Sequence, residues 1–161
     1  MASIKLKLDF DGLLEAVKAA GGDVDRAAMR AANECAAAVH SELVSECNAS
    51  GVPSSVSSEI THGVNVTGGG NMYEVEVGWK KGEYNPQSPS AAYKAIFLNY
   101  GTARRAARKK THVPYGGGWA TTANRGQIVG RGFIQRAKKS AGKRVKKVQK
   151  EALQEMLKEL T

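Results

Sequence analysis

The sequence predicts an α+β fold, in which a small antiparallel sheet with a central hairpin packs against helices. Apolar and polar residues alternate over 3–10 and again on both sides of a glycine-rich turn at 67–71, and this is the period of strands. Apolar residues recur at steps of three and four over 24–43 and over 134–160, and this is the period of helices. With 161 residues, 42% of them hydrophobic, we expect a single domain spanning 1–161.

The chain is predicted to begin with a strand and two helices. The alternation over 3–10 gives that strand one buried face. Asp11 is expected to cap a short helix that runs through Ala20 and stops at two glycines. Asp23 is expected to open a longer helix, whose many alanines imply close packing against a sheet. The apolar positions of that helix are Val24, Ala28, Ala31, Cys35, Val39 and Leu43.

A hairpin is predicted in the middle of the chain. Residues 48–58 are rich in Ser, Gly and Pro and are expected to form a connection. A strand beginning at Ile60 turns back at 67–71 and continues as a second strand that reaches Trp79. These two strands are expected to be antiparallel neighbours.

The C-terminal half is predicted to hold a helix, an extended loop and a longer helix. Ser88-Pro89 is expected to supply the cap and the first position of a helix that Gly101 ends. The segment at about 102–129 has no clear period, and we expect this loop to order on assembly. An amphipathic helix at about 132–160 follows, with Gly142 as an expected bend. Its apolar stripe consists of Ile134, Ala137, Ala141, Val145, Val148, Ala152, Met156 and Leu160.

Charge is divided unevenly along the chain. Residues 1–83 contain 7 Lys and Arg against 12 Asp and Glu, whereas residues 84–161 contain 17 against 3. Copies arranged head to tail would set the acidic face of one against the basic face of the next. The surplus of cations would still attract an outside polyanion. Composition alone does not choose among nucleic acid, an acidic protein surface and anionic lipid.

The cations of the second half are the candidate interface, facing either DNA or another subunit. The loop supplies Arg104, Arg105, Arg108, Lys109, Lys110 and Arg125. The C-terminal helix and its entry supply Arg131, Arg136, Lys139, Lys143, Lys146, Lys147 and Lys150. Like charges this close destabilise an isolated helix by a few tenths of a kcal/mol per pair, so we expect phosphate or another subunit opposite them. The simpler interpretation is a solvated face that keeps the protein soluble.

The sequence shows no set of residues for catalysis. His40, His62 and His112 fall on a helix, a strand and a loop without metal-ligand spacing. The glycine-rich segments match neither a phosphate-binding loop nor a full dinucleotide fingerprint. Clustered carboxylates, which a metal-dependent nuclease needs, are missing from the basic half. We therefore predict no enzyme activity, no catalytic residues, no cofactor and no metal.

The cysteines and the apolar runs indicate the compartment. Cys35 and Cys47 are twelve residues apart on one predicted helix, about 18 Å along its axis, so they cannot pair. They are expected to be small core residues that suit a reducing cytoplasm. The run at 95–98 is far shorter than the roughly 20 residues of a membrane span, and the lysine-bearing start lacks the apolar stretch of a secretory signal. We expect the protein to stay inside the producing cell, away from membranes.

Two phrases of the basic half resemble a known assembly family. Leu-Asn-Tyr-Gly-Thr at 98–102 ends a predicted helix, and Arg-Gly-Phe-Ile-Gln-Arg-Ala at 131–137 enters the last one. Together with the order of elements, they resemble the neck proteins of long-tailed bacteriophages, which are head-tail joining or tail-completion proteins. That family usually has an acid where this chain has Asn99, and a proline where it has Gly132.

The residues of the two phrases also have expected structural roles. Tyr100 and Phe133 are expected to anchor the core where helix meets loop. Gly101 is expected to be a left-handed cap, and Thr102 a local hydrogen bonder that starts the loop.

The resemblance implies a non-enzymatic structural protein of the virion. Such a subunit forms a closed ring at the head-tail junction or upper tail, around genomic double-stranded DNA in the lumen. Its other partners are neighbouring neck and tail proteins, namely the head-closure or connector protein and the tail terminator or tube. It is assembled in the cytoplasm of the bacterial host.

A stand-alone basic nucleic-acid-binding protein is the alternative. In that case the loop and the last helix would clamp nucleic acid, with Tyr115 or Trp119 stacking on bases.

Overall fold

The computed structural model describes residues 2–67, 72–82, 85, 88–102, 111–112, 119–120 and 128–160. In chain order its elements are β1 (Ser3–Leu8), α1 (Asp11–Ala19), α2 (Val24–Ala49), α3 (Ser54–Ser57), β2 (Ile60–Thr67), β3 (Met72–Trp79), α4 (Ala91–Tyr100), β4 (Thr111–His112), β5 (Trp119–Ala120) and α5 (Phe133–Leu160). The predicted α+β class is confirmed.

The main sheet has three antiparallel strands in the order β1-β3-β2. The predicted hairpin is confirmed as the β2-β3 pair, in which Val64 lies opposite Val75. The turn at 68–71 lies outside the described residues. β1 pairs with the other edge of β3, so that Leu6 also lies opposite Val75. The alternation predicted for β1 is confirmed, because Ile4 and Leu8 are buried while Lys5 is exposed.

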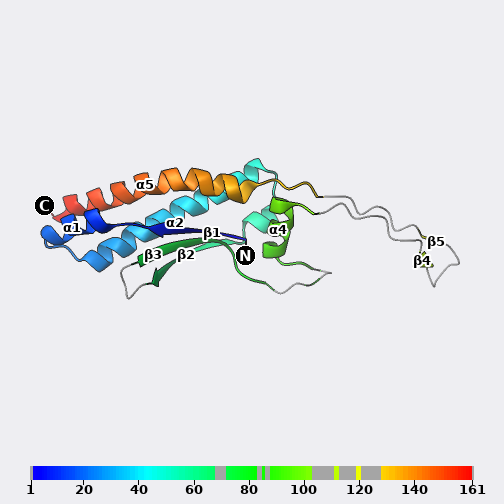
Figure 1. The fold of residues 1–161 in the computed structure, drawn as a ribbon, viewed down its shortest axis with the longest axis horizontal. Helices are drawn as coiled ribbons and strands as arrows, with labels where there is room; N and C mark the ends of the chain where they lie inside the picture. The colour runs from blue at the N-terminus through cyan, green and yellow to red at the C-terminus, as the bar shows by residue number, and fades with distance from the viewer. Residues whose placement is uncertain are drawn as a thin grey trace.

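Two long helices lie side by side along one face of this sheet (Figure 1). α2 packs against β2 and β3, as its alanines predicted, and also against α5, which the alanine pattern did not reveal. Asp23 caps α2 as predicted, since its side chain accepts a hydrogen bond from the Arg26 amide at 3.1 Å. Cys35, Val39 and Leu43 on α2 have no exposed surface. The core therefore lies between the helix pair and the sheet.

Two predicted caps are wrong by one or two positions. α1 begins one residue earlier than expected, with Phe10 as its cap, because the Phe10 carbonyl already accepts a hydrogen bond from Leu14 at 3.0 Å. α4 begins later than Ser88-Pro89 predicts, since the first bond of the helix joins the Lys94 amide to the Ser90 carbonyl.

The packing of Ser90 explains the later start of α4. A Cβ atom placed on Gly82 would lie 2.6 Å from the Ser90 Cβ, so the Ser90 side chain packs directly over this glycine. The Ser90 backbone is extended, with ψ 160°, and this keeps the preceding residues out of the helix.

The last helix, α5, confirms the predicted apolar stripe. Six of its eight predicted positions are buried, Val148 is half-buried, and the side chain of Leu160 lies outside the described part. Phe133, Gln149 and Leu153 are also buried and widen the stripe. The helix runs unbroken through Gly142, where a bend was expected.

The predicted loop at 102–129 contains a short strand pair that its sequence did not reveal. Thr111 lies opposite Ala120, and His112 opposite Trp119, in the antiparallel pair β4-β5. Most other residues of this loop lie outside the described ranges. The predicted connection at 48–58 likewise contains a short helix, α3.

Candidate interface on the basic helix and its junction

The outward face of α5 carries a row of exposed lysines. Lys139, Lys143, Lys146 and Lys150 recur at steps of three and four, opposite the buried stripe. Among the described residues, no acidic side chain lies within ion-pair distance of any of these four. Lys147 differs, because its ammonium lies 3.6 Å from Glu151 one turn on. These four lysines, named here the "lysine row", therefore present charge to the outside that no described acid balances.

Part of the charge of α5 is balanced within the chain. The Arg136 guanidinium lies 2.9 Å from the Glu46 carboxylate, and the Arg144 guanidinium lies 2.6 Å from Glu42. Both glutamates belong to α2, which runs antiparallel to α5. From the sequence we expected negative charge opposite the basic helix, supplied by phosphate or by another subunit. For these two arginines the acids are on the neighbouring helix.

Arg131 binds the C-terminal end of α2. Its guanidinium donates to the Ser50 carbonyl at 2.8 Å and to the Gly51 carbonyl at 2.7 Å. Carbonyl groups at a helix end lack partners within the helix and attract cations. Arg136 reinforces the contact, since it donates to the Ser50 hydroxyl at 2.6 Å. Both arginines, predicted to face DNA or another subunit, use their donors inside the chain.

The two phrases singled out in the sequence meet each other in space. Gly101 forms an antiparallel bridge with Val129. The Thr102 amide donates to the Ile128 carbonyl at 2.9 Å, and the Thr102 hydroxyl accepts from the Ile128 amide at 3.1 Å. Thr102 is thus a hydrogen bonder, but across the root of the loop rather than locally. Gly101 has φ 80° and ψ −174°, an extended conformation of positive φ instead of the expected left-handed helical cap.

Of the two expected core anchors, one is confirmed and one is wrong. Phe133 has no exposed surface, and its ring packs edge to face on Trp79 with centroids 6.2 Å apart. Tyr100 is 62% exposed. One residue step turns a helix by about 100°, and the preceding residue, Asn99, occupies the buried position instead. Tyr100 precedes Gly101 and Thr102, whose backbones pair with Val129 and Ile128, so three exposed apolar residues, named here the apolar patch, belong to the loop root.

Asn99 has a structural role that the sequence did not reveal. Its side-chain oxygen accepts a hydrogen bond from the Ile134 amide in the first turn of α5 at 2.8 Å. Its Nδ2 has no partner within the described residues. The signal in the sequence was only a departure from the family pattern, and that departure gave no indication of a contact 35 residues away.

Six predicted cations of the loop cannot be placed. Arg104, Arg105, Arg108, Lys109, Lys110 and Arg125 lie outside the described residues, as does Tyr115. For Trp119, the described features are limited to its backbone pairing in β5.

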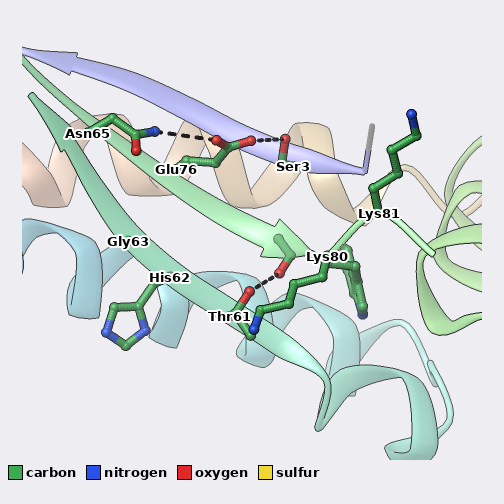
Figure 2. A pocket seen from close by; sticks show the side chains of 10 residues that line it. Ser3, Thr61, His62, Gly63, Asn65, Glu76, Lys80 and Lys81 are labelled. Atoms are coloured by element: carbon green, nitrogen blue, oxygen red, sulfur yellow. Dashed lines mark hydrogen bonds between the residues drawn. The ribbon is translucent and has the colours of Figure 1, made fainter. Parts of the chain in front are cut away.

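The uncovered face of the sheet carries a polar hollow of about 320 Å³ (Figure 2). Glu76 in this hollow accepts from the Ser3 hydroxyl at 3.1 Å and from the Asn65 amide at 3.5 Å. The Lys5 ammonium lies 3.3 Å from the same carboxylate. Lys80 and Lys81 are exposed at its end. Glu76 is held by structural contacts, and no nucleophile of the hollow hydrogen-bonds to a histidine in the contacts that the structure describes.

The cysteines are buried, as predicted. Burial raises the pKa of the Cys35 thiol and that of the Cys47 thiol to about 11 each, with a smaller contribution from the neighbouring Glu34 and Glu46. Within the part of the chain that the structure describes, no three His, Cys, Asp or Glu residues gather to hold a metal ion. None of the described helices has the length and apolar character needed to cross a bilayer.

The described residues form an α+β fold with a cation-rich helix face and an exposed apolar patch, features that suit a protein that binds other macromolecules. The family model described as "Bacteriophage HK97-gp10, putative tail-component" matches residues 11–101, from α1 through the end of α4. Because the match covers more than half of the chain, the chain belongs to this family and is a structural protein of a bacteriophage virion. The predicted resemblance to neck proteins of tailed phages is thereby confirmed. Separate searches of curated proteins and of solved structures found no match.

Proposed function

We propose that this protein is a ring-forming subunit at the head-tail junction, a neck or tail-completion protein that surrounds the DNA path. The observation that carries the proposal is the lysine row on α5, in a protein of a phage tail family. Arg136 and Arg144 are paired inside the chain, whereas the row has no acidic partner among the residues that the structure describes. Its charge is therefore available to DNA phosphate or to an acidic neighbouring protein.

The apolar patch of Tyr100, Ile128 and Val129 supports a second contact. These side chains are 62%, 39% and 75% exposed. Exposed apolar groups that cluster in this way are typical of surfaces that bind another protein. The patch and the lysine row differ in chemistry, so they suit a heterologous interface that closes into a ring. We assign the patch to a neighbouring subunit or to an adjoining connector or tail-terminator protein.

The cations of the second half of the chain are expected to divide their contacts between DNA and protein. Each phosphate contact adds a salt slope of about 0.9, and many contacts around a ring would hold DNA in place instead of letting it pass. Some cations must therefore face protein. We propose that the loop cations Arg104 to Lys110 do so, which leaves Lys139 and Lys143 of the lysine row as the surface nearest the lumen.

The test is a charge reversal in the phage itself. A phage that carries Lys139→Glu and Lys143→Glu should produce filled heads and finished tails that fail to join stably, as should a phage that lacks the protein. Lys80→Glu with Lys81→Glu, directly after β3, is the control of equal charge change and should join normally. Electron microscopy of lysates distinguishes these outcomes. Infectious particles at normal yield without the protein would refute the proposal.

Native mass and nucleic-acid binding separate this proposal from a stand-alone nucleic-acid-binding protein. A ring subunit should form a closed oligomer, alone or with its partners, and should bind free DNA weakly at physiological salt. Tight binding of single strands by a monomer, lost in Trp119→Ala, would favour the alternative instead.

A further inference from the structure

In the part of the chain that the structure describes, no strand pairs with the outer edge of β1. The Trp79 amide donates to the Ala2 carbonyl at 3.2 Å, so the antiparallel alternation directs the backbone of Ala2, and of every second residue after it, toward β3. The N–H and C=O groups of Lys5 and Lys7 then point away from β3. Next in this outward series is the Asp9 carbonyl, which accepts a hydrogen bond from the Gln149 side chain of α5. The edge is thus closed at one end, and along Lys5 and Lys7 it has no backbone partner among the described residues.

A groove of about 540 Å³ lies between this strand and α5. Leu6, Leu8 and Val145 give it an apolar floor. Gly142 leaves room in its wall, since a Cβ atom at that position would meet nothing within 4 Å. The groove is lined by the consecutive residues Leu6 to Asp9, as expected where an extended segment lies beside the edge of β1.

The rim of the groove is cationic. Lys7, Lys146 and Lys150 line it, and none of them has an acidic partner among the described residues. Among the described residues of the lining, Asp9 is the acid. An occupant would need apolar groups for the floor and carboxylates for the rim. A DNA backbone has no apolar side to place against Leu6 and Val145, whereas an acidic peptide meets both needs.

The pairing of β1 with β3 indicates which residues a further strand beside β1 would carry. β3 presents acids opposite lysines, with Glu74 opposite Lys7 and Glu76 opposite Lys5. The Lys5 ammonium lies 3.7 Å and 3.3 Å from these two carboxylates. The same lysines are presented to a neighbour on the outer edge, so that edge favours the same alternation of acidic and aliphatic residues.

We propose that an extended segment of another virion protein, with alternating acidic and aliphatic residues, adds to β1 as a fourth strand in this groove. Its aliphatic side chains cover Leu6, Leu8 and Val145. Its carboxylates meet Lys7 on the open face, and its flanking acids meet Lys146 and Lys150. The inference rests on the proposed function only in naming the partner as a virion protein.

The test uses a fluorescent peptide, Glu-Val-Glu-Val-Glu-Val-Glu, and polarisation with the full chain. Gly142→Leu fills the groove and should weaken binding about tenfold or more, while melting at the same temperature as the native chain or higher. Lys146→Glu with Lys150→Glu should weaken it by about the same factor. Lys139→Glu with Lys143→Glu has the same charge change on the same helix outside the groove, and should leave binding within about twofold.

Four results would overturn the inference. They are an absence of peptide binding, an equal loss in both lysine pairs, full binding by Gly142→Leu, and equally tight binding of a Lys-Val-Lys-Val-Lys-Val-Lys peptide. If duplex DNA displaces the peptide, and the Gly142→Leu variant still binds the DNA, the surface would be assigned to nucleic acid. Native mass separates the two proposals. A chain that binds the peptide but never forms a ring contradicts the proposed function alone, whereas a ring that ignores the peptide contradicts this inference alone.

Discussion

The Asn99 side-chain oxygen accepts a hydrogen bond from the Ile134 amide at 2.8 Å, so the last turn of α4 caps the first turn of α5. The Asn99 carbonyl also accepts from the Gly132 amide at 3.0 Å. Amides in the first turn of a helix have no partner in their own helix. A glycine has no side chain to cap them, and Asn99 provides the missing acceptor from elsewhere in the chain. These hydrogen bonds therefore hold the end of α4 against the start of α5, at the two ends of the loop that connects them.

Asn99→Ala should lower the free energy of unfolding by about 1–2 kcal/mol, because it leaves a buried helix amide without an acceptor. Asn99→Asp retains an oxygen at the helix N-terminus, where negative charge is favoured, and should lose less. Urea denaturation at pH 7 measures both. If Asn99→Ala unfolds at the urea concentration of the native chain, the Ile134 bond does not stabilise the fold.

Gly132 is expected to resist substitution. Its φ of 61° is in the left-handed region, and its amide is bound to Asn99. Gly132→Ala should cost about 1–2 kcal/mol of stability from backbone strain. Gly132→Pro should cost about 3 kcal/mol or more, because proline fixes φ near −65° and has no N–H. This chain therefore cannot take the proline that its family resemblance leads one to expect.

The control for this prediction is Gly142, which lies inside α5 with open space around it. Gly142→Ala should raise stability by about 0.5–1 kcal/mol, since alanine favours a helix. The same urea titration compares the two alanine variants. Equal effects at both positions would show that the backbone conformation of Gly132 carries no strain for other residues.

Elements with a strong local period could be predicted from the sequence. Ala137 and Ala141 recur on the helical period and are fully buried, and Val75 and Val77 alternate on β3 in the same way. Such periods need only the residues of the element itself. The start of α4 was misplaced because it depends on Ser90 packing over Gly82, which no local pattern contains.

The candidate site was harder to predict, because its residues are brought together over long distances in the chain. Arg136 pairs with Glu46, 90 residues earlier, and Arg131 donates to a carbonyl at the end of α2. Counting charges by halves of the chain indicated that cations and acids would meet, but not that some would do so within one molecule. Tyr100 was placed in the core on its aromatic character alone, and the rotation of α4 exposes it.

The buried cysteines predict a dependence of stability on alkaline pH. The folded-state pKa of Cys35 and of Cys47 is about 11, above the ordinary thiol value of about 8.5. The unfolded chain therefore loses these protons first. The stabilisation is complete below about pH 8.5 and falls as pH rises toward 11. Urea denaturation from pH 7 to pH 10 should show a shallower decline in Cys35→Ala with Cys47→Ala, and equal declines would contradict the assignment.

The same burial makes both thiols unreactive in the folded protein. A thiol-specific dye at pH 8 should label Cys35 and Cys47 slowly in the native chain and rapidly in urea, since the thiolate is the reacting form. Rapid labelling of the native chain at low dye concentration would mean that α2 opens readily.

Arg131 and Lys143 separate stability from binding among the basic residues. Arg131→Gln should lower the free energy of unfolding by about 0.5–1.5 kcal/mol, because its bonds to the Ser50 and Gly51 carbonyls are lost. It should leave the salt dependence of DNA binding unchanged. Lys143→Gln removes an exposed charge from the lysine row and should change stability by less than about 0.5 kcal/mol. Where Lys143 meets phosphate, the salt slope should fall by about 0.9.

DNA binding of the assembled ring over a series of salt concentrations measures the slope for both variants. Lys147→Gln is a control, because the positive charge of Lys147 is already partly balanced by the nearby Glu151 carboxylate. If Arg131→Gln lowers the slope as much as Lys143→Gln does, the Arg131 guanidinium leaves the end of α2 to bind phosphate. Its contacts with Ser50 and Gly51 would then hold only in the free subunit, and the division of cations into structural and exposed groups would not survive assembly.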